Sequence, residues 1–166
     1  MIRNRTGARR QGMRKLPSLV FFLLLVLGGG ALAGLSSAPD AWYARLAKPS
    51  FTPPNGVFAP VWTALYVLMA VAGWRAWQAP PATRRGLMAA WIVQLALNFL
   101  WSPLFFAAHR IGLALADIVL LLAAIATFIV LAARRGETAA ALLMAPYAAW
   151  VAFATVLNAA LFRLNG

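Results

Sequence analysis

The chain contains no cysteine, one histidine and only three acidic residues among its 166 positions. The absence of cysteine excludes disulfides, thiolate metal sites, iron–sulfur clusters and cysteine nucleophiles. The three acids, Asp40, Asp117 and Glu137, lie in separate segments and form no tandem carboxylate motif for general acid–base catalysis. A Ser-His-Asp site would have to use His109, so the residue inventory argues against a hydrolase.

Charge is scarce as well. Only 11% of the residues are charged and 63% are hydrophobic, whereas soluble domains carry roughly 25% charged residues. The formal net charge is nevertheless +12, because 15 residues are Lys or Arg. In a chain this apolar, topology signals at the ends of membrane helices explain the basic excess better than nucleic-acid binding does. We therefore expect an integral membrane protein with no nucleic-acid partner.

Five apolar stretches approach the length of about 20 residues that crosses a bilayer as a helix. They cover residues 17–37, 57–78, 87–107, 112–133 and 139–162. The predicted fold is all-α: a bundle of five transmembrane helices formed by residues 16–166 as one domain, preceded by a basic cytoplasmic tail of residues 1–15.

The first apolar stretch has some features of a secretory signal peptide. Basic residues precede it, and Ala31-Leu32-Ala33 has the small-residue pattern of a cleavage site. The stretch continues to spanning length, however, and Gly30 and Gly34 form a pair of small residues suited to close packing against another helix. We interpret it as a retained helix, with cleavage as the alternative.

The distribution of basic residues predicts the orientation in the membrane. Eleven lie on the N-terminal side: six within residues 1–15, together with Arg75, Arg84, Arg85, Arg134 and Arg135. Four lie on the opposite side: Arg45, Lys48, Arg110 and Arg163. The positive-inside rule then places the N-terminus in the cytoplasm and the C-terminus outside. A bacterial inner membrane is favoured, and an outer membrane is the alternative.

The segment of residues 36–57 is the one long loop. Pro49, Pro53 and Pro54 oppose a regular helix, while Trp42, Tyr43 and Phe51 are more apolar than a solvated linker requires. We expect a structured cap over one end of the bundle. The alternative is a belt of interfacial aromatic residues.

Amide side chains mark one face of the third apolar stretch. Trp91, Gln94, Asn98 and Trp101 are three, four and three residues apart and share that face. An amide in hydrocarbon requires a hydrogen-bond partner, so Gln94 and Asn98 are expected to face the bundle interior. Their partner is either another helix or a ligand, and the spacing does not decide between the two.

Large aromatic residues beside small ones form similar stripes on two further helices. These stripes are Trp62, Tyr66, Met69 and Gly73 on the second stretch, and Tyr147, Trp150, Ala154 and Asn158 on the fifth. Three such helices together would line a slot for a flat, apolar ligand with a few polar edges. Core packing is the alternative, and the residues alone favour it.

The fourth stretch carries Asp117 inside the predicted span. An ionisable residue at that depth is a functional candidate, but Arg110 lies on the same side of the membrane, and an ion pair between the two is the favoured interpretation. His109 is the only histidine available as an axial haem ligand, and its place at a helix end favours a surface role instead.

Three segments carry a resemblance to a known family. The first segment runs from Trp42-Tyr43 through Lys48-Pro49-x-x-x-Pro53-Pro54 to Pro60-Val61-Trp62. The second segment is Gln94-x-x-x-Asn98-x-x-Trp101-x-Pro103-x-Phe105-Phe106. The third segment is Pro146-Tyr147-x-x-Trp150-x-x-Phe153-Ala154-x-x-Leu157-Asn158. Together they resemble the TspO/MBR family of tryptophan-rich sensory proteins and mitochondrial translocator proteins. The resemblance covers about residues 36–165.

The resemblance implies a homodimer of five-helix bundles whose first loop caps a pocket for porphyrins, haem and drug-like small molecules. Carried over by position, together with Tyr66 from the stripe above, the expected ligand-binding residues are Tyr43, Trp62, Tyr66, Asn98, Trp101, Phe106, Ala116, Leu120, Trp150, Ala154 and Leu157. Porphyrin or haem would be the ligand, with no cofactor or metal required. Membrane lipid is a further expected partner.

Two departures from the family pattern limit what is carried over. Leu113 stands where animal members often have Trp, and Ala159 stands where their cholesterol-binding segment has Tyr, so cholesterol binding is not expected. The predicted function is tetrapyrrole binding with a sensory or sequestering role. One alternative is light- and oxygen-dependent porphyrin degradation, with Trp62 and Trp150 as candidate redox residues. The other is transport of tetrapyrrole or lipid, although the sequence shows no inverted repeat.

Overall fold

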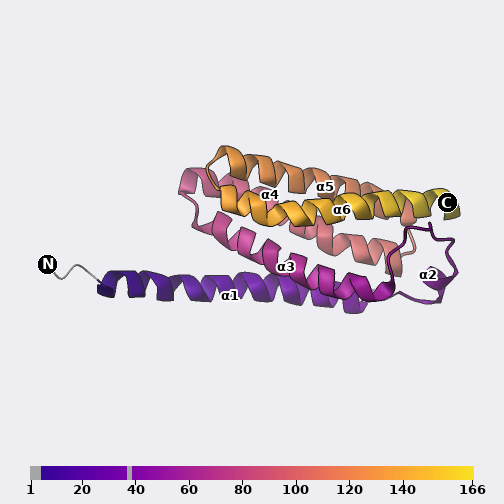
Figure 1. Cartoon of the computed structure of the whole chain (residues 1–166), viewed down its shortest axis with the longest axis horizontal. Helices are drawn as coiled ribbons and strands as arrows, with labels where there is room; N and C mark the ends of the chain where they lie inside the picture. The colour runs from indigo at the N-terminus through magenta and orange to yellow at the C-terminus, as the bar shows by residue number, and fades with distance from the viewer. Residues whose placement is uncertain (1–4, 37–38) are drawn as a thin grey trace.

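A computed structural model describes residues 5–36 and 39–166, with side chains described for residues 16–35 and 39–166. The helices in chain order are α1 (Arg5–Ser36), α2 (Ala41–Arg45), α3 (Asn55–Gln78), α4 (Pro81–Ser102), the π-helix η1 (Pro103–Ala107), α5 (Ile111–Arg134) and α6 (Thr138–Asn165). The long helices run side by side along one axis, and α1 lies at the edge of the bundle along α3 (Figure 1).

Five helical segments of the described chain are long and apolar enough to cross a membrane. They are Leu16–Leu35, Asn55–Gln78, Pro81–Ala107, Ile111–Arg134 and Thr138–Asn165. The predicted all-α, five-span fold is therefore confirmed, and the protein is a multi-pass integral membrane protein. The first helix begins earlier than predicted, because its backbone is already helical at Arg5.

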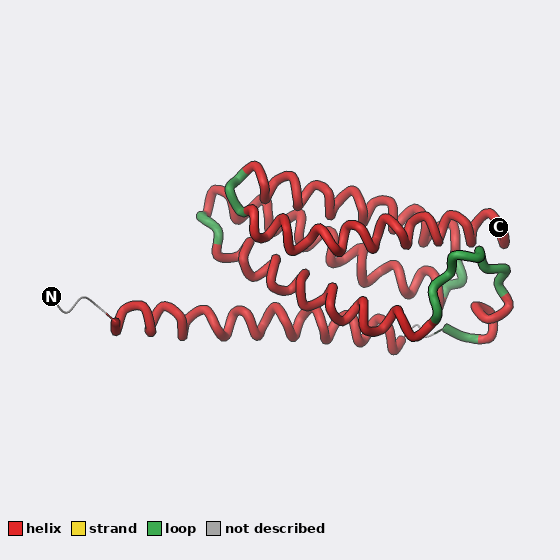
Figure 2. Tube along the Cα trace, viewed as in Figure 1, coloured by secondary structure: helices red, strands yellow, loops and turns green. Residues whose placement is uncertain are grey.

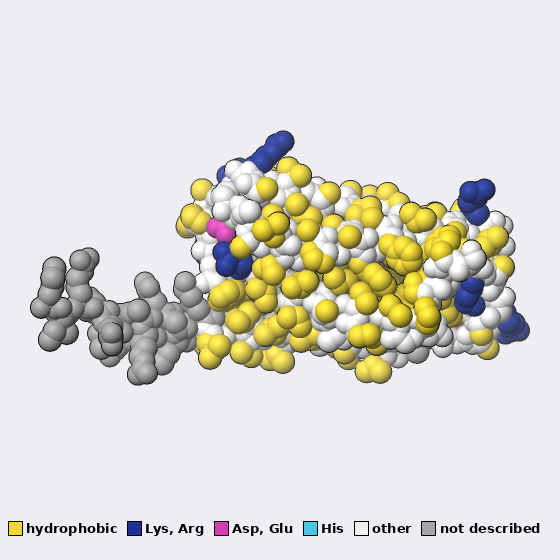
Figure 3. Space-filling view, viewed as in Figure 1, with side chains coloured by type: hydrophobic (Ala, Val, Ile, Leu, Met, Phe, Trp, Pro, Cys, Tyr) yellow, Lys and Arg dark blue, Asp and Glu magenta, His cyan; other side chains and the backbone are white. Residues whose placement is uncertain are grey.

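The two ends of the bundle differ in their connections. The short α3–α4 and α5–α6 turns lie at one end, toward the N-terminus, whereas the residue 39–54 segment and the C-terminus lie at the other end (Figure 2). In the space-filling view, Lys and Arg side chains lie at both ends and apolar side chains cover the surface between them (Figure 3). This distribution is what a bundle surrounded by hydrocarbon requires.

Local chemistry sets the helix boundaries. Pro81 occupies the first position of α4, where a missing backbone N–H costs no hydrogen bond. Gly136, with a φ of 80°, ends α5 in the left-handed region that suits glycine. At the other end, Pro103 begins the wider π-turn, and Ala108 N donates to Pro103 O over 2.9 Å. Such turns are often found at functional sites.

Close helix contacts form the end of the bundle that lies toward the N-terminus. Trp91 is buried, donates its indole N–H to Met69 O over 3.0 Å, and packs on Gly73, where an added Cβ would clash with the ring. Phe22 of α1 meets Trp91 edge-on, with ring centroids 5.1 Å apart. Met69, Gly73 and Trp91 thus belong to the helix-packing core, as the core-packing alternative predicted.

The predicted cap is confirmed as a structured element. It contains the short helix α2, which lies before the three prolines, and its N-cap is Asp40, whose Oδ1 accepts from Tyr43 N over 3.1 Å. At its other end, Lys48 Nζ donates to the carbonyl oxygens of Tyr43, Ala44 and Leu46 over 2.7–3.3 Å. A cation at the C-terminal carbonyls of a helix is favourable, because those groups lack partners within the helix.

Candidate functional site

A cavity of about 660 Å³ lies within the bundle beneath the cap. This volume is within the range of roughly 300–1,000 Å³ that small-molecule sites occupy. Its wall comprises residues of α1 (Leu27, Gly30, Ala31, Ala33, Gly34), the cap (Pro39, Tyr43), α3 (Asn55, Phe58, Ala59, Trp62, Thr63, Tyr66), α4 and η1 (Asn98, Trp101, Ser102, Phe105, Phe106), α5 (Ile118, Leu121) and α6 (Trp150, Val151, Ala154, Leu157, Asn158, Leu161).

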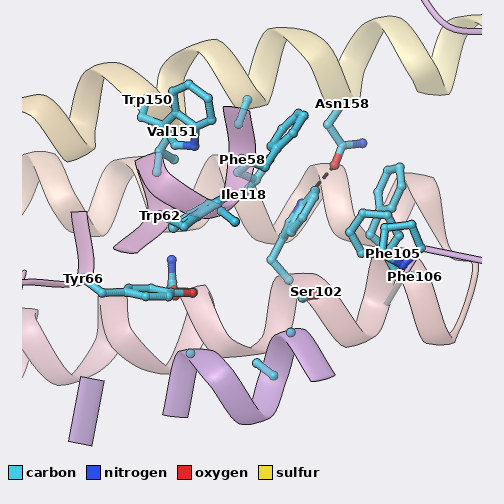
Figure 4. Close-up of a pocket in the computed structure, with 18 of the residues that line it drawn as sticks. Phe58, Trp62, Tyr66, Ser102, Phe105, Phe106, Ile118, Trp150, Val151 and Asn158 are labelled. Atoms are coloured by element: carbon cyan, nitrogen blue, oxygen red, sulfur yellow. Dashed lines mark hydrogen bonds between the residues drawn. The ribbon is translucent and has the colours of Figure 1, made fainter. Parts of the chain in front are cut away.

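Aromatic side chains of α3 and α6 form one wall of this cavity. Trp62 and Tyr66 are one turn apart on α3, with ring centroids separated by 5.4 Å. Phe58, one turn earlier, meets Trp150 of α6 edge-on at 6.0 Å. Figure 4 shows these four rings converging on one space from two helices. Aromatic faces and edges of this kind suit a flat ring system.

The π-turn supplies the second aromatic wall. Trp101 and Phe105 are stacked, with centroids 5.1 Å apart and an interplanar angle of 23°. Phe106 meets Tyr43 of the cap edge-on at 5.2 Å. A regular α-helix rotates successive residues by about 100°. The wider turn of η1 changes that spacing, and both Phe105 and Phe106 line the cavity.

The cavity offers few polar groups. Asn98 Nδ2 donates to the Tyr147 hydroxyl over 2.9 Å, while Asn98 Oδ1 is buried without a hydrogen-bond partner. Within the described part of the chain, neither a charged side chain nor a histidine lines the cavity. An apolar wall with one unpartnered amide oxygen fits an apolar ligand body that carries a hydrogen-bond donor.

Nine of the eleven predicted ligand residues line this cavity. They are Tyr43, Trp62, Tyr66, Asn98, Trp101, Phe106, Trp150, Ala154 and Leu157. The structure brings them together from five elements, and their binding of a ligand stays a prediction.

Ala116 and Leu120 do not line the cavity. Both lie on the exposed face of α5, where Leu120 is 59% exposed. Their neighbours Ile118 and Leu121 line it instead. The position-by-position transfer was wrong here because α5 turns a different face toward the interior.

Gln94 and Asn98 share a helix face but have different roles. Gln94 Nε2 donates to Trp91 O within α4 over 3.0 Å, and Gln94 does not line the cavity. Asn98, one turn later, bonds α6 through Tyr147 and also borders the cavity. Tyr147 itself is completely buried in the packing core. Of the two alternatives, the structure shows another helix as the partner of Asn98, whereas Gln94 bonds its own helix; ligand binding by Asn98 stays a prediction.

The predicted Arg110–Asp117 ion pair is wrong. Asp117 is buried on α5 with its Oδ2 unpartnered, Arg110 is exposed, and among the described side chains the ion pair at this end joins His109 to Asp40. Arg110 occupies the N-cap position of α5, seven residues before Asp117, and its backbone (φ −101°, ψ 71°) departs from the helix.

His109 holds the cap to the bundle rather than lining the cavity. Its Nε2 lies 3.2 Å from Asp40 Oδ2, and its ring stacks on Trp42 at 4.1 Å. The hydrogen bond from Tyr43 N is the main cause that lowers the pKa of Asp40, and the electrostatic attraction of His109 lowers it further. Burial raises this pKa, but by less than the hydrogen bond lowers it. The pKa of Tyr43, by contrast, is raised by burial in the cap. The expected surface role of His109 is confirmed, and it is a specific contact between segments 69 residues apart.

Several cavity residues were not predicted. Phe58 lies one turn before Trp62, so extending the stripe on α3 by four residues would have found it. Phe105 could not be found by extending a stripe along α4, because the π-turn that begins at Pro103 interrupts the helical period. On α1, the sequence marked Gly30 and Gly34 only as a helix-packing pair, and no motif marked Leu27, Ala31 or Ala33.

The geometry agrees with comparisons to known proteins. Residues 21–164 match the model of the TspO/MBR family. The chain is 39% identical over 149 residues to the tryptophan-rich protein TspO of Archaeoglobus fulgidus, covering 89% of this chain and 96% of that protein. It is 36% identical over 148 residues to the tryptophan-rich sensory protein of Cereibacter sphaeroides, covering 89% and 92%. It is 40% identical over 127 residues to the human translocator protein, covering 75% of each chain.

Proposed function

Because the chain belongs to the TspO/MBR family, we propose that it is a membrane sensory protein that binds tetrapyrroles, such as protoporphyrin IX, in the aromatic cavity. The carrying observation is that rings from α3, α6, η1 and the cap surround one cavity that no charged side chain of the described chain enters. A planar macrocycle is the ligand shape that such walls complement.

The lining residues favour a metal-free ring over haem. Among the described residues that line the cavity, the side chains that offer an oxygen ligand to iron are phenols, hydroxyls and amides, and no imidazole is among them. Of the residues that usually hold haem iron, which are His, Cys, Met and Tyr, the described cavity lining offers only Tyr43 and Tyr66. Protoporphyrin is therefore expected to bind at least as tightly as haem. Drug-like aromatic molecules of similar flatness are expected to compete for the same cavity.

We infer a sensory or sequestering role for this binding. The cap is held over the cavity by contacts on two sides of the bundle, from Asp40 to His109 and from Ala47 to Asn165. A closed site of this kind suits retention of a ligand. Membrane lipid is expected to surround the bundle, and we propose that the protein is a homodimer, which chemical crosslinking in liposomes tests.

The proposed orientation places the N-terminus in the cytoplasm of a bacterial inner membrane and the cap outside. The α3–α4 and α5–α6 turns lie at the end of the bundle toward the N-terminus. Arg84 and Arg85 near the start of α4, Arg134 at the end of α5 and Arg135 in the α5–α6 turn place basic side chains at this end. The positive-inside rule supports this assignment. A reporter fused to the C-terminus is expected to be active only outside the cytoplasm; activity inside contradicts the orientation.

A titration in the dark tests the binding itself. Purified protein is titrated with protoporphyrin IX and with haem, and tryptophan quenching and porphyrin absorbance are followed. Trp150→Ala removes a wall of the cavity and is expected to weaken protoporphyrin binding at least several-fold, because aromatic pairs contribute about 0.5–1.5 kcal/mol beyond area burial. Trp77→Ala is the matched control, since Trp77 is 48% exposed and does not line the cavity. Equal affinity in both variants contradicts the proposed site.

A further inference from the structure

The end of the bundle that lies toward the N-terminus has basic side chains with few acids to pair with them. From Arg75 to Arg85, around the α3–α4 turn, the chain carries three arginines and no acidic residue. Of the three acids in the chain, Asp40 belongs to the cap at the opposite end, and Asp117 is buried within α5. Glu137 is the N-cap of α6 and lies in the other turn at this end. The α3–α4 turn therefore has no acid of its own.

The three arginines around this turn also have no acceptor within the described part of the chain. None of the described residues forms an ion pair with Arg75, Arg84 or Arg85, and none accepts a hydrogen bond from their side chains. Arg75 Nε is even buried without an acceptor. At the cap end, by contrast, Lys48 Nζ donates to three carbonyl oxygens, and Arg45 Nε donates to a backbone carbonyl oxygen over 3.1 Å. The guanidinium groups around the α3–α4 turn are therefore available to an anion from outside the chain.

An aromatic ring orients one of these guanidinium groups. The guanidinium carbon of Arg84 on α4 lies 5.1 Å from the ring centroid of Trp77 on α3. This cation–π contact restricts the guanidinium plane and leaves its N–H groups available. The N–H groups of a guanidinium form a rigid fork that matches the oxygen atoms of a phosphate. Arg84 is therefore preorganised to bind a phosphate group.

Trp77 lies where the apolar surface of the bundle meets its charged end. It is the last residue but one of the Asn55–Gln78 span, and it is 48% exposed. All seven tryptophans lie within the described residues, and Trp77 is the exposed one among them. Tryptophan is enriched at the membrane interface, because its ring is apolar and its indole N–H is polar. Phospholipid headgroups lie at the same depth, so a phosphate at this position is within reach of Arg84.

We propose that Arg84, oriented by Trp77, binds the headgroup of an anionic phospholipid. The lipid phosphate accepts hydrogen bonds from the Arg84 guanidinium, and Arg85, the next residue of α4, adds to the attraction. In the proposed orientation this end faces the cytoplasmic leaflet, where anionic lipids attract basic side chains. A zwitterionic lipid also carries a phosphate, but its ammonium group cancels the charge, so it binds less tightly. This site is separate from the cavity, since neither Trp77 nor Arg84 lines it.

Native mass spectrometry of the full chain tests this site. Delipidated protein in detergent is mixed with equal amounts of phosphatidylglycerol and phosphatidylcholine with the same acyl chains, and the ratio of the two lipid-bound forms is measured. The wild-type protein is expected to favour phosphatidylglycerol at least fivefold. Arg84→Gln is expected to reduce this preference at least threefold, because it removes a hydrogen bond between charged groups. Trp77→Leu keeps every charge but removes the ring that orients Arg84, and is expected to reduce the preference about twofold.

Two matched variants separate this site from general attraction by net charge. Arg134→Gln removes one charge at the same end of the bundle, from the last turn of α5, and Arg163→Gln removes one charge from the last turn of α6. Each is expected to change the preference by less than a factor of about 1.5, because salt screens a charge without a fixed geometry. An unchanged preference in Arg84→Gln overturns the proposal, and so do equal losses in Arg84→Gln and Arg134→Gln. Melting temperatures in the same detergent verify that the variants are folded.

Tryptophan quenching in liposomes provides a second readout that involves no porphyrin and is independent of the proposed function. Phosphatidylglycerol and phosphatidylcholine, each with brominated acyl chains and at the same mole fraction, are compared as quenchers. Because Trp77 is the exposed tryptophan, phosphatidylglycerol is expected to quench the wild-type protein more strongly. Trp77→Phe and Arg84→Gln are each expected to lose this excess, and high salt is expected to reduce it in the wild type. Equal quenching of the wild-type protein by the two lipids, or an excess that persists in Arg84→Gln, contradicts the proposed site.

Discussion

Trp101 of α4 donates its indole N–H to Asn158 Oδ1 of α6 over 3.0 Å. Asn158 Nδ2 in turn donates to Ile111 O at the start of α5 over 3.1 Å. One buried amide thus joins three helices behind the aromatic wall of the cavity. Figure 4 shows the Trp101–Asn158 bond as the dashed line. The orientation of the Trp101 ring, and of Phe105 stacked on it, depends on this bridge.

Asn158→Ala is expected to lower the free energy of unfolding by about 1–3 kcal/mol, because it leaves the partly buried Trp101 N–H without an acceptor. Thermal unfolding in detergent measures the change. Trp101→Phe removes the donor but keeps an aromatic ring, so combining both substitutions should cost less than the sum of the two single changes. If the cost of the double substitution equals the sum of the two single costs, the Trp101–Asn158 hydrogen bond contributes nothing to stability.

Ala154→Leu is expected to weaken protoporphyrin binding while leaving the melting temperature nearly unchanged. Ala154 lines the cavity, so a leucine there occupies ligand space, and leucine is a good helix former. Ala149→Leu on the exposed face of α6 is the control. A collapse of the melting temperature with unchanged affinity would identify Ala154 as a helix-packing residue.

Gly73→Ala and Gly86→Ala are expected to act in opposite directions. A Cβ at Gly73 enters the Trp91 ring and is expected to cost about 1–3 kcal/mol of stability through overpacking. A Cβ at Gly86, inside α4, meets nothing within 4 Å and is expected to stabilise the helix by about 0.5–1 kcal/mol. Melting temperatures of the two variants in one detergent check both signs, and a neutral Gly73→Ala contradicts the close contact.

Asp40→Asn is expected to loosen the cap at neutral pH and to have no effect in acid. The folded-state pKa of Asp40 is lowered from 3.8, mainly by the hydrogen bond from Tyr43 N. The stabilisation from its charge is therefore present above about pH 4 and is lost as the pH falls through the lower folded-state pKa. Hydrogen exchange of α2 amides, compared between wild type and variant, should differ at pH 6 and converge at low pH. A difference that persists at pH 2 would assign the effect to something other than this charge.

Trp62→Phe and Trp150→Phe separate binding from light-dependent degradation. Both variants keep an aromatic face, so most protoporphyrin binding is expected to remain. For a binding protein, illumination bleaches porphyrin at the same rate with wild type, with either variant and in protein-free micelles. Faster bleaching by wild type that disappears in the two variants would instead support the enzymatic alternative.

The sequence by itself determined the number of membrane helices, the cap and most of the aromatic wall. Apolar length fixes a span, and a period of 3.6 residues places Trp62 with Tyr66, and Trp150 with Ala154, on common faces. These are local properties, because each depends on residues within one helix. The proline-rich loop likewise predicted a cap from its composition alone.

Only the tertiary structure decided which neighbour each face meets. Gln94 and Asn98 share a stripe, yet Asn98 alone borders the cavity, and Ala116 and Leu120 turn outward where Ile118 and Leu121 turn inward. The Asp40–His109 contact joins residues 69 positions apart. Helical periodicity gives the angle of a side chain about its own axis but not the position of the next helix. That position depends on close contacts such as Gly73 with Trp91 and Gly30 with Tyr66, which form only when the helices pack.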